Sequence, residues 1–138
     1  SITQLVATQI AAKRAYSMAG IKANDIDLAE IHDCFTIAEL LATEDLGFAN
    51  RGEGGLFARE NRGKRNEGNT CINPSGGLKS KGHPLGATGT GQTVEIFKQL
   101  RGEVESIRQV RDAETALSHN VGGSGATCAV HVYGRDKT

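Results

Sequence analysis

The sequence predicts an α/β domain in which helices pack on a mixed β-sheet that ends in a C-terminal β-hairpin. Three observations predict it. Apolar residues recur at helical spacing in three segments, short apolar runs typical of strands lie between them, and a glycine-rich turn at 121–125 joins the last two strands. A length of 138 residues fits one domain, residues 1–138, with a buried core.

The first half of the chain alternates helices and a strand. Gly20 is a plausible end for the first helix, and the second helix follows the strand through His32 and Cys34. In chain order, we expect a helix at 2–19, a turn at 23–27, a strand at 28–31, a helix at 36–46, and a long, polar, glycine-rich surface loop at 50–69.

The second half returns to the sheet and closes it with the hairpin. In chain order, we expect a strand at 70–73, a glycine-rich bend, a helix at 85–100, a polar connector at 101–114, and strands at 115–118 and 128–133 around the tight turn.

The glycine-rich bend at 73–89 organises the chain. It contains both prolines of the sequence, and residues of this kind cannot form one regular helix or strand throughout. Because the residue before a proline is pushed toward extended geometry, His83 is expected on a rigid bend just before a helix. This placement suits a catalytic imidazole, although a turn with an incidental surface histidine is equally consistent with the pattern.

Chemically active side chains follow three strand ends. His32 and Cys34 follow one strand, and His83 and His119 follow two others, so we expect them on one rim of the sheet. A thiolate and an imidazole on one rim suit acyl transfer, and the backbone of a glycine turn can hold an oxyanion. Cys34 alone could equally be a structural thiol. Zinc is a less favoured alternative, because no ligand pair has the usual close spacing.

Composition and charge exclude several classes of protein. The formal net charge is zero and aromatic residues make up 4%, which argues against nucleic acid as the main partner. No apolar run is long enough to span a membrane, and no signal peptide opens the chain. Three scattered cysteines indicate reduced thiols, and the C-terminus is not a peroxisomal address, so we expect a cytoplasmic protein.

Three segments resemble the C-terminal motifs of thiolases. They are His-Asp-Cys-Phe at 32–35, Gly-His-Pro-Leu-Gly-Ala-Thr-Gly at 82–89, and His-Asn-Val-Gly-Gly-Ser-Gly at 119–125. The cysteine in the first motif and the histidine that begins the third are similar to the sterol-carrier-protein type of thiolase and its archaeal acetyl-CoA acetyltransferase relatives. The resemblance covers nearly the whole chain in the same order.

The resemblance implies a role for each motif residue. His83 matches the histidine that activates the nucleophilic cysteine and contributes to an oxyanion hole. Cys34 matches the acid/base cysteine that moves the α-proton of acetyl-CoA, and His32 matches the position that holds a catalytic water or oxyanion. His119 with Gly122 and Gly123 would contact the substrate. A coenzyme A thioester is the expected substrate, and no further cofactor or metal is implied.

The resemblance also implies that the chain is a part of the family's fold. The family's nucleophilic cysteine lies in an N-terminal half that this sequence lacks, so we expect the isolated chain to be inactive. The first strand of the C-terminal half also has no counterpart. Because the family places that strand at the centre of its sheet, we expect unpaired strand edges. The chain would then pair with a second copy, exchange elements with it, or cover the gap with its first helix, and a homo-oligomer is expected.

Two other functions remain open beside the thiolase. Thiolase-like aldolases share the fold and cleave carbon–carbon bonds without an acyl-enzyme. They are expected to lack the motif cysteine and histidine, which this chain keeps as Cys34 and His83. A non-catalytic scaffold subunit that binds a small zinc-ribbon partner protein is the non-enzyme alternative.

Overall fold

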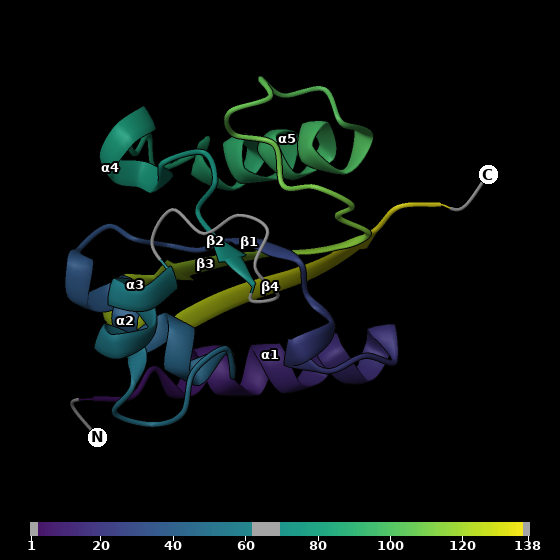
Figure 1. Ribbon diagram of the computed structural model, residues 1–138. Coiled ribbons are helices and arrows are strands. Elements are labelled where there is room, and N and C mark those ends of the chain that lie inside the picture. Colours follow the sequence, from purple (N-terminus) through teal and green to yellow (C-terminus); the bar gives the residue numbers. More distant parts are fainter. Residues whose placement is uncertain (1–2, 62–69, 137–138) are drawn as a thin grey trace.

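A four-stranded sheet carries helices on both faces in the computed structural model, which describes residues 3–61 and 70–136 (Figure 1). The mixed α/β class predicted from the sequence is confirmed. In chain order the elements are α1 (Val6–Ala19), η1 (Ala23–Asp25), β1 (Leu28–Glu30), α2 (Thr36–Asp45), α3 (Gly54–Asn61), β2 (Cys71–Ile72), α4 (Gly77–Lys81), α5 (Thr88–Arg101), β3 (Thr115–Gly122), η2 (Gly123–Gly125) and β4 (Thr127–Gly134), where η marks a 3-10 helix.

The strands lie in the order β2-β1-β3-β4. β1 runs parallel to β2 and to β3, whereas β3 and β4 are antiparallel and form the predicted hairpin. β1 and β3 are direct neighbours, so the described strands leave no gap between them, and the unpaired edges expected at the centre of the sheet are not found. The open edges of the sheet, among the described strands, are those of β2 and β4.

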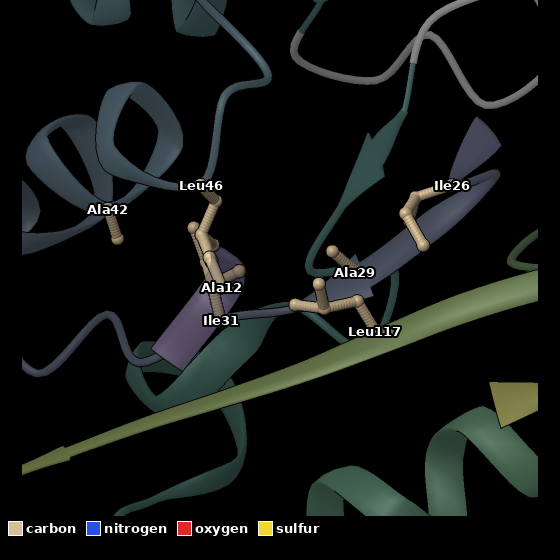
Figure 2. Packing of buried hydrophobic residues seen from close by; sticks show 7 residues of the cluster. All are labelled: Ala12, Ile26, Ala29, Ile31, Ala42, Leu46 and Leu117. Carbon is tan, nitrogen blue, oxygen red and sulfur yellow. The ribbon is translucent and has the colours of Figure 1, made fainter. Parts of the chain in front are cut away.

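One face of the sheet packs against α1, with α2 beside it (Figure 1). Side chains alternate along a strand, so Ala29 and Ile31 point to this face while Leu28 points to the other. Figure 2 shows the resulting buried cluster, which joins α1, α2 and the sheet. It consists of Ala12, Ile26, Ala29, Ile31, Ala42, Leu46 and Leu117.

The opposite face packs against α5, which lies above the sheet in Figure 1. The apolar cluster on this side includes Ile96 and Leu100 of α5 together with Leu28 and Ala116 of the sheet. The helix also exposes Val94 and Phe97 on its outer side. The two faces therefore have separate cores, and the carboxyl ends of β1 and β3 lie between α1 and α5.

The first helix begins at Val6 rather than at residue 2, which lies outside the described residues. The backbone N–H of Leu5 donates to Asp45 Oδ2 at 2.6 Å, and Arg51 Nη1 donates to the carbonyl oxygen of Thr3 at 3.0 Å. The side chains of Asp45 and Arg51 thus bind the backbone of residues 3–5, where a further N-terminal turn of α1 would otherwise lie. Gly20 ends the helix with φ of 69°, as predicted.

The expected loop at 50–69 contains a helix, α3, so the loop prediction is wrong for residues 54–61. The backbone N–H of Gly54 donates to Glu44 Oε1 at 2.9 Å, which ties the start of α3 to α2. Glycine is a poor helix former, and packing on α2 is what the local pattern could not reveal. Residues 62–69 lie outside the described residues.

The remaining boundaries differ where turns replace the ends of expected elements. The helix expected at residue 85 begins at Thr88, because the backbone N–H of Thr88 closes a turn on the Pro84 carbonyl at 3.0 Å. β3 continues to Gly122 instead of ending at 118. The hairpin turn is the short η2, in which Ser124 has φ of 54°. His119 therefore lies inside a strand.

Candidate active site

His32 lies just beyond the end of β1 and is 7% exposed. The backbone N–H of Ile31 donates to Asn73 Oδ1 at 2.8 Å, and the backbone N–H of His32 donates to His119 Nδ1 at 3.4 Å. Bonds to both neighbouring strand segments therefore fix the backbone that carries the first imidazole.

Two carboxylates at the end of β1 anchor the loop that carries His83. Glu30, which is 1% exposed, accepts hydrogen bonds from the backbone and the hydroxyl of Ser75 and from Lys81 Nζ at 2.8 Å. Asp33 Oδ1 accepts from the backbone N–H of Leu78 at 2.7 Å. The short helix α4 is thereby held against β1.

His83 is held through its Nδ1 atom, which lies 2.7 Å from Thr88 Oγ1. Thr88 Oγ1 also lies 3.2 Å from the Pro84 carbonyl oxygen, and when the hydroxyl donates to that carbonyl, Oγ1 accepts from the imidazole. In that arrangement His83 carries its hydrogen on Nδ1, and Nε2 of the neutral ring is an acceptor. The imidazole is therefore held by a residue of α5 that is itself bound to the bend.

The two imidazoles of His32 and His83 are in contact. Their ring centroids lie 4.9 Å apart and their planes meet at 81°. The sequence prediction that separate strand ends bring these histidines to one rim therefore agrees with the structure, although His83 follows α4 rather than β2 directly. Two imidazoles in edge contact can both transfer protons to or from groups of one bound molecule.

A pair of side-chain amides, the buried Gln92 and the half-buried Asn120, lies behind His32. Asn120 Oδ1 lies 2.9 Å from His32 Nδ1, and Asn120 Nδ2 donates to Gln92 Oε1. Gln92 Nε2 donates in turn to the backbone carbonyl of His119 at 3.3 Å. Gln92 is 0% exposed and comes from α5, so this chain of bonds links the helix to the imidazole through β3.

His119 is 0% exposed and lies under the rim instead of on it. Its Nε2 atom is 3.0 Å from Thr8 Oγ1 of α1, and the Thr8 hydroxyl contacts Cys128 Sγ at 3.6 Å. Burial lowers the pKa of His119 to about 3, with a smaller contribution from His32. His119 is therefore a neutral, structural neighbour of His32, and the expected position on the rim is wrong.

Cys34 is half-buried in the segment between His32 and α2. The next residue, Phe35, is the N-cap of that helix and is 69% exposed. The thiol thus lies two residues from the imidazole of His32, at a helix N-terminus that favours an anion. Cys71 is buried in the core beneath α5, and Cys128 is half-buried.

Gly122 and Gly123 lie where β3 passes into η2. A Cβ atom at Gly122 would come within 2.8 Å of Thr127 Oγ1 on the paired strand, so the Thr127 side chain would have to shift to admit one. An open groove of about 720 Å³ runs between α5 and the hairpin and is lined by Asn120, Gly122 and Leu85 among others. The groove therefore adjoins the amide pair behind His32.

Sequence reasoning missed the residues that hold the histidines. The main ones are Thr88, Gln92 and Asn120, together with Glu30 and Asp33. One signal was available, because Thr88 and Gln92 lie on the same helical stripe as the buried Ile96 and are polar. Polar side chains on a buried face need partners, and here the partners lead to the site.

Within the part of the chain that the structure describes, His, Cys, Asp and Glu form no group of three that could hold a metal ion. Among the helices at 3–61 and 70–136, none combines the length and apolar character needed to cross a membrane.

Residues 1–135 match the protein family described as "Thiolase C-terminal domain-like". The chain belongs to this thiolase family. It is 53% identical over 134 residues to an acetyl-CoA acetyltransferase of Methanothermobacter thermautotrophicus, covering 97% of this chain and 34% of that protein. It is 52% identical over 117 residues to sterol carrier protein 2 of Oryctolagus cuniculus, covering 84% of this chain and 21% of that protein.

The fold of this thiolase domain also has a solved counterpart. A chain described as "Ltp2-ChsH2(DUF35) aldolase" superposes with a TM-score of 0.81 at 25% identity, covering 100% of this chain and 34% of that one. The thiolase-like fold expected from the three motifs is thereby confirmed. The chain spans about a third of the length of the acetyltransferase and of the aldolase chain that it matches.

Proposed function

We propose that this chain is the C-terminal catalytic domain of a thiolase that acts on coenzyme A thioesters, such as acetoacetyl-CoA. The observation that carries the proposal is the edge contact of His32 and His83, each with Nδ1 held by a neighbouring side chain. The reaction would be the thiolytic cleavage of a 3-ketoacyl-CoA or its reverse, a Claisen condensation. The identity to acetyl-CoA acetyltransferases supports this substrate class.

In the proposed reaction, His83 acts as the base. Its Nε2 atom, an acceptor in the neutral ring, takes the proton of a nucleophilic thiol. The resulting imidazolium is then a donor at Nε2 and stabilises the oxyanion that forms from the thioester carbonyl. The thiol itself would come from the N-terminal half of the protein, because Cys34, Cys71 and Cys128 are the only cysteines of this chain.

Cys34 is proposed to move the α-proton of the acetyl group, because it lies two residues after His32 in the chain, just before the start of α2. His32 would hold a water or the enolate oxygen at the same carbonyl. Gly122 and Gly123 would contact the acyl group at the hairpin turn. For His119, burial favours a positioning role on the His32 backbone over the direct substrate contact expected from the sequence.

The assembly of the proposed enzyme includes the part of its relatives that this chain does not span, since the chain covers 34% of the acetyltransferase. We propose that the N-terminal half binds this domain and that the complete protein forms a homo-oligomer in the cytoplasm, without a metal or other cofactor. The open edges of β2 and β4 favour association of the chain with itself. A sedimentation experiment that finds only monomer at high concentration would contradict the self-association.

The test substitutes Cys34→Ala in the full-length protein. We expect exchange of the acetyl-CoA α-protons with solvent to be abolished while coenzyme A still binds. Cys71→Ala is the matched control, because Cys71 is buried in the core between the sheet and α5. The Cys71→Ala variant should still exchange the α-protons. Proton exchange that survives in Cys34→Ala would overturn the assigned role.

An aldolase is the second candidate, and the likeness to the Ltp2-ChsH2(DUF35) aldolase favours it. An aldolase would cleave the carbon–carbon bond without an acyl-enzyme, and a small partner protein with a zinc ribbon would then be expected.

Intact mass measurement of the full-length protein mixed with acetoacetyl-CoA separates the two functions. A trapped acetyl group supports the thiolase. Aldehyde release from a 3-hydroxyacyl-CoA without an acylated protein supports the aldolase.

A further inference from the structure

We propose that Gln92 and Asn120 are positioning residues that fix the tautomer of His32, with the hydrogen on Nδ1 and Nε2 left as the acceptor. The catalytic consequence rests on the proposed thiolase function, but the tautomer itself does not. The direction of every hydrogen bond in the chain follows from one fixed group, the backbone carbonyl of His119.

The carbonyl of His119 can only accept. Gln92 therefore turns its Nε2 toward this oxygen, at 3.3 Å, and its Oε1 must face the other way. The reverse orientation would place two oxygen acceptors against each other at a site with 0% exposure. The backbone of β3 thus sets the orientation of a side chain on α5.

The orientation of Gln92 then sets that of Asn120. Gln92 Oε1 needs a donor, and Asn120 Nδ2 supplies it. The other end of the same carboxamide, Oδ1, is left facing His32 Nδ1 at 2.9 Å. An amide oxygen cannot donate, so the hydrogen between these two atoms belongs to the imidazole.

A second contact holds the backbone of the same residue. The backbone N–H of His32 donates to His119 Nδ1, so His119 carries its own hydrogen on Nε2 and donates to Thr8. The ring and the main chain of His32 are therefore fixed from two consecutive residues of β3, whose side chains point to opposite faces of the sheet.

The hydrogen-bonded chain from the His119 carbonyl through Gln92 and Asn120 to the imidazole, called the relay below, has a chemical consequence for His32. A carboxamide keeps the hydrogen on Nδ1 but adds no charge, in contrast to the carboxylate that orients histidine in a catalytic triad. Neutral His32 can accept from a water at Nε2, and it can donate to an oxyanion only after it is protonated. With mixed tautomers, part of the population would present an Nε2–H instead.

Nuclear magnetic resonance on the labelled chain tests the tautomer without any enzyme assay. Long-range correlations between ring hydrogens and nitrogens distinguish a protonated from an unprotonated nitrogen, and the His32→Gln variant assigns the signals. We expect Nδ1–H as the single neutral tautomer of His32 in the unmodified chain. A dominant Nε2–H form would overturn the proposal.

Variants test whether the relay is the cause. Gln92→Met removes both hydrogen bonds of the side-chain amide while the side chain keeps a similar size. This variant should give a mixture of His32 tautomers. Gln99→Met is the matched control, because Gln99 is the other buried glutamine of α5 and bonds to the connector after it. It should leave the tautomer unchanged. A Gln92→Met chain with the unaltered single tautomer would refute the relay.

A second pair of variants covers the case in which Gln92→Met fails to fold. Asn120 is only half-buried, and Asn120→Asp keeps an acceptor at the imidazole while Asn120→Leu removes it. We expect the aspartate to preserve the Nδ1–H tautomer and the leucine to lose it. The same tautomer in both variants would contradict the proposal.

Kinetics in the full-length protein separate this inference from the proposed function. We expect Gln92→Met and Asn120→Leu to lower kcat roughly tenfold with little change in KM, and Asn120→Asp to retain more of the rate. If the unmodified protein has no thiolase activity, the proposed function fails while the resonance result still decides the relay. Normal kcat in Gln92→Met would remove the catalytic role.

Discussion

The imidazole rings of His32 and His83 meet edge to face, with their centroids 4.9 Å apart. Each ring has Nδ1 bound to an uncharged oxygen, Asn120 Oδ1 for one and Thr88 Oγ1 for the other. The two touching rings are thus oriented by separate elements, His32 by a residue of β3 and His83 by a residue of α5.

The Thr88 hydroxyl is predicted to control the rate through His83. Thr88→Val removes the acceptor at Nδ1 and leaves the ring free to turn, so we expect kcat of the full-length protein to fall about tenfold, as for the loss of one buried hydrogen bond. Thr88→Ser keeps the hydroxyl and should stay near the original rate. Equal rates in the two variants would show that this bond is not needed.

His119 is predicted to make the chain less stable in acid. Burial lowers its pKa from 6.5 to about 3, so between these values the unfolded chain binds a proton that the folded chain does not. The contribution to stability is fully present above pH 6.5 and declines by about 1.4 kcal/mol per pH unit below it, down to about pH 3. Urea unfolding of the chain at several pH values measures this slope.

Two histidine variants isolate that slope. His119→Gln should flatten the dependence of the unfolding free energy on pH, because the titrating group is gone. His131→Gln is the control, since His131 is exposed on β4 and should leave the slope as it is. A slope that persists in His119→Gln would assign the acid sensitivity to other groups.

Gly77 is predicted to be required for the anchoring of α4. A methyl group there would collide with the Asp33 carboxylate, and φ is 68°, a conformation that disfavours side chains. We expect Gly77→Ala to lower the free energy of unfolding by about 1–3 kcal/mol and to reduce activity by displacing the loop of His83. Urea unfolding and kcat of the full-length protein measure the two effects.

Gly55 provides the comparison for that substitution. It lies in α3, where an added methyl group meets nothing within 4 Å and φ is not positive. Gly55→Ala should be neutral or stabilise the chain by a few tenths of a kcal/mol, because alanine favours the helix. Equal destabilisation by both alanines would show that the Asp33 contact is not the cause.

Some elements could be read from local patterns because their physical cause is local. The helix of α1 and its end at Gly20, the strand before His32, and the glycine turn between the last strands each depend on spacing or backbone freedom within a few residues. The helix α3 could not be predicted locally, because its glycines disfavour a helix and its stabilising contact is with Glu44 of α2. The position of His119 was predicted wrongly because strand β3 extends beyond the apolar residues that indicate a strand.

The α/β class, the three motifs and the residue types of the proposed chemistry, His32, Cys34 and His83, could be predicted from the order of amino acids alone. The contact between the two imidazoles, the burial of His119, and the position of Gln92 and Asn120 behind His32 depend on how the chain folds in three dimensions. The reason is that a hydrogen bond depends on the distance and direction between groups. For partners such as His32 and Asn120, these are set by the packing of α1 and α5 on the sheet rather than by neighbours along the chain.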